Sequence, residues 1–272
     1  MARTARVKAS GEGTMRYHLI SRANNRQFLF RKAIAKDRLM EMARRAAEFS
    51  GIELVVATVM DNHFHIVCKV VRTGEAVPQQ EEIVRRVRVL KGDKAADRLE
   101  ERWSGYAAAG MTEELDRELD AYRVRMNDIS AYMKTMKELY SIWFKREYGY
   151  VGSIWDGTFK STMIEDGRYL ETCRRYVMMN PIRAGIVTQA KDYRWTYVGC
   201  ETHGCAGCLP AGKVPQISSG KVFGSEAFVR KWIAALGDKF RARRTTARSV
   251  GELGFATHGW RLAESNVRAA AA

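Results

Sequence analysis

Nowhere does the 272-residue chain contain the ~18 consecutive apolar residues that a membrane-spanning helix needs. Its first residues, MARTARVKASGEGTM, are basic but lack an apolar core, so a secretory signal is not expected. The chain has only five cysteines, an odd number, and they are scattered. This pattern argues against a disulfide framework and for a reducing compartment. We therefore expect a cytoplasmic protein without a membrane partner.

Acidic residues are scarce relative to basic ones. The chain has 31 Asp and Glu against 46 Lys and Arg, for a formal net charge of +15 and a pI of about 9.8. Such a surplus favours a polyanionic partner, because each Lys or Arg that contacts a phosphate releases condensed counterions. The alternative is a solvated basic surface on an ordinary enzyme. With 46% hydrophobic and 28% charged residues, the chain has enough apolar material for a folded core.

The residue pattern divides the chain into three parts and shows no internal repeat. Residues 1–14 are polar and are expected to form a basic flexible tail. Residues 15–200 read as one domain, interrupted by a charge-rich insertion at 72–127 in which we expect two helices, with a break near Gly105 and Gly110. Residues 201–272 form a basic C-terminal extension with a short helix.

Strands and helices alternate within the domain. MRYHLISR at 15–22 predicts a strand, and IELVVATVM and HFHIVCKVV predict two more, joined by a turn at Asp61 and Asn62. Apolar spacing predicts helices from Arg31 to Ser50, from Ile129 onward, and from about Asp166 to Met179. The expected class is α+β or α/β, with an antiparallel hairpin at its centre.

Two of the five histidines, His63 and His65, are separated by one residue on a predicted strand. Because side chains alternate across a strand, both imidazoles should point to one face while Phe64 packs on the other. Two adjacent neutral imidazoles form part of a site for a divalent metal. A surface pair, or core histidines satisfied by hydrogen bonds, is the alternative. No HExxH motif or Cys-x2-Cys ribbon nearby indicates a hydrolytic zinc site.

The predicted helix at 166–179 carries Tyr176 in RRYVMMNP, beside Arg174 and Arg175. A phenol with a pKa near 10 is a poor nucleophile at neutral pH, but neighbouring cations and a metal-bound phosphate would make it effective. Asn180 lies four residues later, on the same helix face, so its side-chain oxygen is a candidate ligand for the same metal. For a single tyrosine among eleven, a purely structural role is the alternative.

The segment CETHGCAGC gathers four residues able to bind zinc within nine positions, namely Cys200, His203, Cys205 and Cys208. Their spacing is tight for one tetrahedral site, and the usual ribbon has two separated halves. A loop with free thiols is the other interpretation.

The ordered set of these segments resembles the single-tyrosine, IS200-like transposases of the HUH (histidine-hydrophobic-histidine) superfamily, and within it the REP-associated tyrosine transposases. The resemblance covers a little over half of the chain and departs from the family at Asp61, where a proline is usual; we expect a changed hairpin turn and unchanged chemistry. It rests on YHLISRANNRQFLF (17–30), VMDNHFHIVCKV (59–70), the long segment 129–187 and DYRWTYVG (192–199).

The resemblance implies a ferredoxin-like antiparallel sheet with helices on one face, plus the charged helical insertion. It implies that His63 and His65 bind Mg²⁺ or Mn²⁺, with Asn180 as a further ligand. Tyr176 would be the nucleophile that cuts single-stranded DNA and forms a 5′-phosphotyrosine intermediate. The expected substrate is a hairpin DNA element, bound by a monomer or homodimer near the nucleoid.

Basic and aromatic residues around these motifs suit a single-stranded nucleic acid, since cations follow the backbone and aromatic rings stack on bases. The candidate DNA-binding residues are Arg16, Arg22, Trp155, Phe159, Lys160, Arg174, Arg175 and Arg183. Both aromatic side chains have a core position as the alternative. Other readings of the whole chain are an HUH nickase of replication or plasmid transfer, a DNA-binding protein whose catalysis has lapsed, and a metal-binding structural protein.

Overall fold

The computed structural model describes residues 13–72, 77–198, 222–225 and 227–228. Among these residues, no helix is long and apolar enough to cross a membrane. The predicted tail at 1–14 and the extension at 201–272, with its short helix, lie almost wholly outside the described residues. In chain order, the helices and strands are β1 (Gly13–Arg22), a 3-10 turn (Asn24–Arg26), α1 (Ala33–Ser50), β2 (Ile52–Val59), β3 (His63–Arg72), α2 (Gln80–Lys91), α3 (Asp93–Ala108), α4 (Thr112–Arg123), α5 (Ile129–Tyr148), β4 (Lys160–Ile164), α6 (Arg168–Met178), α7 (Asn180–Arg183), a second 3-10 turn (Ala190–Asp192), β5 (Thr196–Val198) and β6 (Val222–Phe223).

The strands form one sheet in the order β5-β2-β3-β1-β4-β6. Strand β1 runs antiparallel to both β3 and β4, and β2 runs antiparallel to β3 and β5, whereas the short β6 pairs with β4 in parallel. The central order β2-β3-β1-β4, with a helix between β1 and β2 and another before β4, is the split βαβ arrangement of a ferredoxin-like fold. The predicted α+β class and antiparallel ferredoxin-like sheet are therefore confirmed.

The turn between β2 and β3 forms at Asp61 and Asn62, as predicted. The backbone N–H of Met60 donates to the carbonyl of His63 at 2.8 Å and closes the hairpin. The Asp61 carboxylate pairs with the buried ammonium of Lys36 on α1 at 2.6 Å, and its carbonyl accepts from the N–H of Phe30 at 2.8 Å. At the position where the resembled family usually has proline, this chain uses an aspartate to fix the turn to α1.

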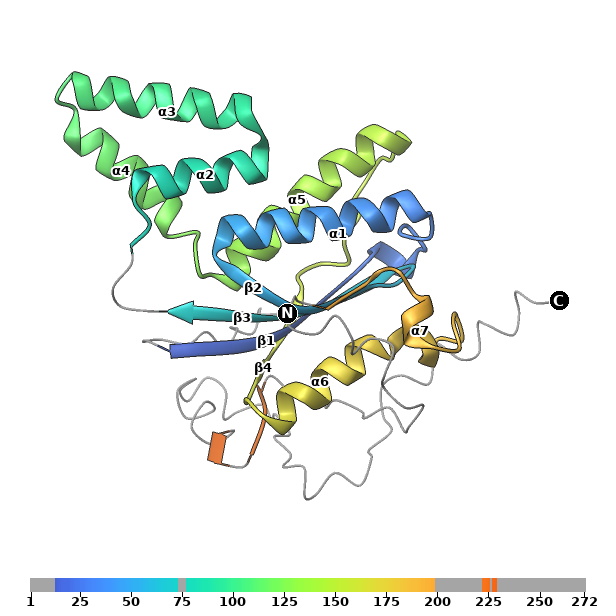
Figure 1. The fold of residues 1–272 in the computed structure, drawn as a ribbon. Helices are drawn as coiled ribbons and strands as arrows, with labels where there is room; N and C mark the ends of the chain where they lie inside the picture. The colour runs from blue at the N-terminus through green and yellow to red at the C-terminus, as the bar shows by residue number, and fades with distance from the viewer. Residues whose placement is uncertain (1–12, 73–76, 199–221, 226, 229–272) are drawn as a thin grey trace.

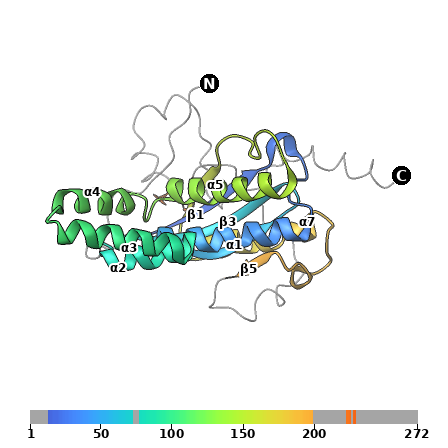
Figure 2. The ribbon, with the colours of Figure 1, turned by 90° about the horizontal axis from the view of Figure 1, so that it is seen from above.

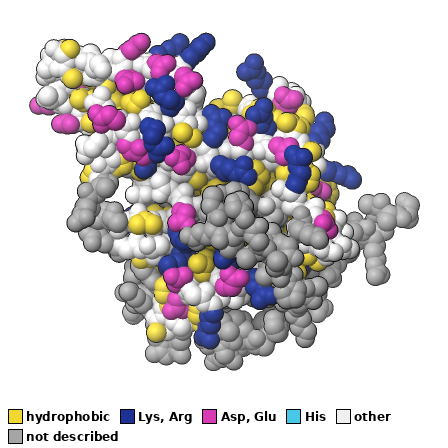
Figure 3. Space-filling model, viewed as in Figure 1, with side chains coloured by type: hydrophobic (Ala, Val, Ile, Leu, Met, Phe, Trp, Pro, Cys, Tyr) yellow, Lys and Arg dark blue, Asp and Glu magenta, His cyan; other side chains and the backbone are white. Residues whose placement is uncertain are grey.

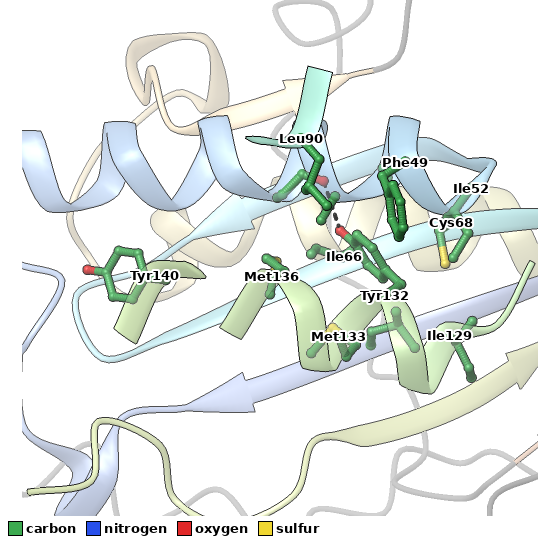
Figure 4. Close-up of a cluster of buried hydrophobic side chains, with 14 of the residues drawn as sticks. Phe49, Ile52, Ile66, Cys68, Leu90, Ile129, Tyr132, Met133, Met136 and Tyr140 are labelled. Carbon is green, nitrogen blue, oxygen red and sulfur yellow. Dashed lines mark hydrogen bonds between the residues drawn. The ribbon is translucent and has the colours of Figure 1, made fainter. Parts of the chain in front are cut away.

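Helices α1 and α5 lie side by side over one face of the sheet (Figures 1 and 2). A large apolar cluster fills the space between these helices and the strands (Figure 4). Within it, the Tyr132 hydroxyl of α5 donates to the carbonyl of Ala43 in α1 at 3.3 Å, so the two helices are also joined by a buried hydrogen bond. Asp128 begins α5 by accepting from the N–H groups of Ser130 and Ala131.

Helix α6 lies on the opposite face of the sheet (Figure 1), so the prediction of helices on one face alone is corrected. Its buried side chains, including Cys173 and Val177, pack against Val56, Val67 and Ile164 of three strands. Because side chains alternate along a strand, these three residues point away from α1 and α5. They form a second apolar surface, which α6 buries.

The predicted charged insertion contains three helices, α2, α3 and α4, where two were expected. Gly105 lies inside α3, whereas the chain turns at Gly110 (φ 69°), as predicted, and also at Gly92 (φ 87°). These positive φ values suit glycine, which has no Cβ to clash. The three helices project beyond one end of the α1–α5 layer (Figure 2), and side chains of both charges mix on their surface (Figure 3).

Candidate active site

The predicted histidine pair lies on β3, in the centre of the sheet. His63 and His65 point to the face covered by α6, with ring centroids 5.0 Å apart. Phe64, between them, packs in the opposite core, where its ring lies 5.8 Å from that of Trp155. The alternation expected from the sequence is thus present. His65 is fully buried and His63 is half-buried, so the pair reaches from the interior to the surface.

Tyr176 reaches the histidines from α6. Its ring centroid lies 5.8 Å from that of His65 and 6.0 Å from that of His18. The end of this helix is attached to the sheet by the Thr58 hydroxyl, which donates to the carbonyl of Val177 at 3.0 Å. Because Thr58 is the cross-strand partner of His65, the same part of the sheet positions both the tyrosine and the histidine. Tyr176 therefore contacts a histidine of its own chain.

Two arginines bring positive charge to the phenol. The Arg183 guanidinium of α7 lies 5.1 Å from the centroid of the Tyr176 ring. Burial raises the pKa of Tyr176 above its usual value, and this rise is opposed by the charge of Arg183, by a hydrogen bond from the same guanidinium, and by the charge of Arg22. Arg22 pairs with His63 across β1 and β3, so it lies at the same end of the site. Both arginines favour a negatively charged oxygen at this position.

All three histidines of the site are held neutral. Burial lowers the pKa of His18 and of His63 to about 3, and it lowers the pKa of His65 well below the usual range. The positive charges of Arg22 and Arg183, and those that His63 and His18 would carry if protonated, further lower the pKa of His65. A neutral imidazole keeps a lone pair on one ring nitrogen, which is the form that binds a metal.

The nitrogen atoms of the pair suit a divalent metal. His65 Nε2 is buried and has no hydrogen-bond partner, and His63 Nδ1 is bonded to Asn62 Oδ1 at 2.7 Å, which leaves the other ring nitrogen for a ligand. In the described part of the chain, no group of three or more His, Cys, Asp or Glu side chains is arranged to hold a metal. Within that part of the chain, the candidate metal ligands of the site are therefore the two imidazoles of the pair and the proposed Asn180.

Asn180, the predicted third ligand, lies at the start of α7 and is buried. Its amide nitrogen donates to the carbonyl of Tyr176 at 3.0 Å. This bond places the side chain beside the last turn of α6. Whether its oxygen serves a metal stays a prediction.

The other predicted basic residues lie at different places. Lys160 is exposed. It lies opposite Ile20 on the neighbouring strand, and Ile20 lies opposite His65 on the next strand, so the side chains of Lys160 and His65 point to the same face of the sheet. Two strand spacings separate these two residues by about 10 Å. Arg16 forms an ion pair with Asp166 near the start of α6. Arg174 forms an ion pair with Glu171 at 3.1 Å, and Arg175 is half-buried on α6.

Trp155 and Phe159 are not brought to the tyrosine. Both are largely buried, at 9% and 8% exposure, and they belong to the core under α5. The Trp155 indole N–H donates to the Ser141 hydroxyl at 2.8 Å. Together with lysines of α5, including Lys137, the two rings line a hollow of about 600 Å³ on the α5 side of the sheet. Both side chains therefore occupy core positions, which was the alternative to DNA stacking in the sequence analysis.

The sequence reasoning missed two residues of the site, His18 and Asn62. His18 lies on β1, and its Nε2 is 2.9 Å from Nδ1 of His65. The signal was present, because His18 and Arg22 are four residues apart on one strand and so share a face. The proposed zinc ligands Cys200, His203, Cys205 and Cys208 lie outside the described residues.

The structure places the histidine pair on a central strand of a ferredoxin-like sheet and Tyr176 on a later helix, the elements in which the resemblance to HUH transposases predicted them. Residues 13–108, which include both histidines, match the family model described as "Transposase IS200 like". The predicted resemblance to IS200-like transposases is thus confirmed over these residues. Tyr176 lies outside the matched range. None of the curated proteins matches the chain.

Two of the solved structures that are similar to the chain are transposases by description. One is a REP-associated tyrosine transposase bound to a REP hairpin, at 16% identity and a TM-score of 0.48, with 81% of this chain and 97% of that chain covered. The other is a protein described as a transposase from Deinococcus radiodurans R1, at 18% identity and a TM-score of 0.28, with 61% of this chain and 92% of that chain covered.

Proposed function

We propose that the protein cuts and rejoins single-stranded DNA, with Tyr176 as nucleophile and hairpin DNA as substrate. The observation that carries this proposal is the contact between the rings of Tyr176 and His65, whose centroids are 5.8 Å apart. It lies on the face of the sheet that carries His63 and His65, both of which belong to the segment that matches the family model. A phenol, two neutral imidazoles and two guanidinium groups in one place are a set of groups suited to phosphate chemistry.

In the proposed reaction, the Tyr176 oxygen attacks a DNA phosphorus in line with the bond to the 3′ oxygen. An O–P bond to the tyrosine forms as the P–O3′ bond breaks, which gives a 5′-phosphotyrosine and a free 3′-OH. A 3′-OH then attacks the same phosphorus and displaces the tyrosine, so the strands are joined without a nucleotide cofactor. Arg22 and Arg183 favour the phenolate and attract the phosphate.

His63 and His65 are the residues that would hold a divalent cation, Mg²⁺ or Mn²⁺, with Asn180 as a proposed further ligand. When bound, such an ion supplies Lewis-acid stabilisation of the charge on the phosphate oxygens. The residues of this chain keep both imidazoles neutral, and burial excludes water from His65.

The charge distribution supports a DNA partner on the body of the protein and disfavours the insertion as a DNA clamp. Residues 80–123, which span α2 to α4, hold nine Lys and Arg and eleven Asp and Glu. The +15 surplus therefore comes from the rest of the chain. We propose the described cations Arg22, Lys160 and Arg183 as backbone contacts, with Arg16, Arg174 and Arg175 as further candidates, and a DNA-associated location near the nucleoid.

The test is formation of a covalent protein–DNA complex. A labelled single-stranded hairpin from DNA flanking the gene is incubated with the protein and Mn²⁺ and run on a denaturing gel. Wild type should give a shifted band that disappears with EDTA and in Tyr176→Phe. Tyr169→Phe is the matched control, because Tyr169 is also a buried tyrosine of α6, two turns earlier, and should leave the band intact.

A band that survives Tyr176→Phe would remove Tyr176 as nucleophile. Binding to several hairpins without any band, with either metal, would indicate a DNA-binding protein whose catalysis has lapsed.

A second test concerns the role of Trp155 and Phe159 in stacking on DNA bases. Because both rings are core residues on the other side of the sheet, Phe159→Leu should leave hairpin affinity nearly unchanged.

A further inference from the structure

His18 is the one buried histidine of the site to which the proposed reaction gives no role. It lies on β1, diagonal to His65 on the neighbouring strand, and only 2% of its surface is exposed. The two rings are stacked, with centroids 5.1 Å apart and an interplanar angle of 18°. His18 Nε2 and His65 Nδ1 are 2.9 Å apart, within hydrogen-bond distance. This contact fixes the orientation of the more deeply buried member of the histidine pair.

A single hydrogen atom lies between these two nitrogens, and its position decides which nitrogen of His65 is free. If His18 donated, neutral His65 would carry its own hydrogen on Nε2. That N–H would be buried without a partner, in a place where Arg22 and Arg183 add positive charge. If His65 donates from Nδ1, its Nε2 carries a lone pair instead, which the same positive charges favour.

The second histidine of the pair shows the same pattern with a partner whose role is unambiguous. The Asn62 amide nitrogen donates to the carbonyl of Arg26 at 3.2 Å, which fixes the orientation of that amide. Asn62 Oδ1 therefore faces His63 Nδ1 at 2.7 Å and can only accept. His63 carries its hydrogen on Nδ1, and its Nε2 is free as a lone pair. Two different residues thus leave the same ring nitrogen available on both histidines.

We propose that His18 is a positioning residue, which accepts a hydrogen bond from His65 Nδ1 and so presents His65 Nε2 as a ligand for the cation. This inference rests on the proposed function and deepens it, because it assigns a residue outside the ligand pair to the same site. Hydrogen bonds from the second nitrogen of a ligand histidine are the usual means of fixing its tautomer and ring orientation. Here the acceptor is a neutral imidazole, so it orients His65 without adding charge.

The first experiment measures Mn²⁺ affinity directly, by electron paramagnetic resonance of free Mn²⁺ in titrations without DNA. His18→Ala should weaken binding about 10- to 100-fold, the usual effect of losing such a partner. His18→Gln, whose side-chain oxygen can accept the same hydrogen bond, should recover most of the affinity. Val67→Ala is the matched control, since Val67 is the buried cross-strand partner of His18 and makes no side-chain hydrogen bond. It should destabilise the fold while leaving Mn²⁺ affinity unchanged.

The second experiment observes the tautomer itself, by ¹⁵N spectroscopy of the imidazoles in metal-free protein. His65 should carry its hydrogen on Nδ1 in the wild type and in His18→Gln, and should shift toward the Nε2–H form in His18→Ala. An Nε2–H form in the wild type, or wild-type Mn²⁺ affinity in folded His18→Ala, would overturn the inference.

Failure of the proposed function gives a different result. If no covalent DNA band forms but Mn²⁺ binding depends on His18, the catalytic proposal is wrong and the positioning role of His18 is supported. If the band forms but His18→Ala leaves Mn²⁺ affinity unchanged, the positioning role is wrong and the catalytic proposal is supported.

Discussion

Mild acid should destabilise the metal-free protein strongly, because its site holds neutral histidines in the interior. His18 is 2% exposed and His65 0%, and burial lowers the pKa of His18 to about 3 and that of His65 well below its usual value. In the unfolded chain the same imidazoles have pKa values near 6.5. A base whose folded pKa is depressed contributes stability above the unfolded pKa, and this stability is lost as the pH falls toward the folded value.

The magnitude follows from the difference in bound protons. At about one pH unit below 6.5, each histidine that is neutral when folded and titrates freely when unfolded costs about 1.4 kcal/mol. The result depends little on the folded pKa as long as that value stays below about 4. His18 and His65 together should therefore lower the free energy of unfolding by about 3 kcal/mol between neutral pH and pH 5.5. His63, whose pKa is also lowered to about 3, should add a similar amount.

The assay is urea unfolding in EDTA at a series of pH values from about 7.5 to 5.5. All measurements use a chain in which His203 and His258, which lie outside the described residues, are replaced by Asn, so that only the site's histidines titrate. In that background His18→Gln should reduce the pH dependence by about one proton. A free energy of unfolding that stays flat across this range, or the same slope with and without His18, would refute the claim that these histidines are neutral in the folded protein.

Three further predictions concern other contacts. Asp61→Asn leaves the buried Lys36 ammonium unpaired; since the aspartate side chain is 28% exposed, we expect a loss of about 1–3 kcal/mol in urea unfolding, against little change for Lys36→Met. Arg183→Gln removes a charged hydrogen bond from Tyr176, so the rate of covalent complex formation should fall about tenfold or more at neutral pH and recover partly as pH rises; an unchanged rate would exclude this contact. Cys173 is fully buried and burial raises the pKa of its thiol, so alkylation followed by peptide mass spectrometry should find it unmodified until the protein is unfolded.

Several features were determined by the sequence itself, because they depend on local periodicity. The one-residue spacing of His63 and His65 on an apolar strand was enough to put both on one face and Phe64 on the other. The turn at Asp61 and Asn62 and the helix from Ile129 follow equally from short-range pattern. The family resemblance added the ferredoxin-like antiparallel sheet, which the structure confirms, and the assignment of Tyr176 as nucleophile, which stays a prediction.

Only the tertiary structure decided which helix and which side chains contact the histidine pair. Helix α6 covers the second face of the sheet because Val56, Val67 and Ile164 form an apolar surface there, and these residues come from three strands that are distant in sequence. The bond between His18 and His65 spans 47 residues and exists only because β1 pairs with β3 in one register. A one-residue slip would turn His18 to the other face. Neither spacing nor composition carries that information, since register and helix cover are settled by the packing of the whole sheet.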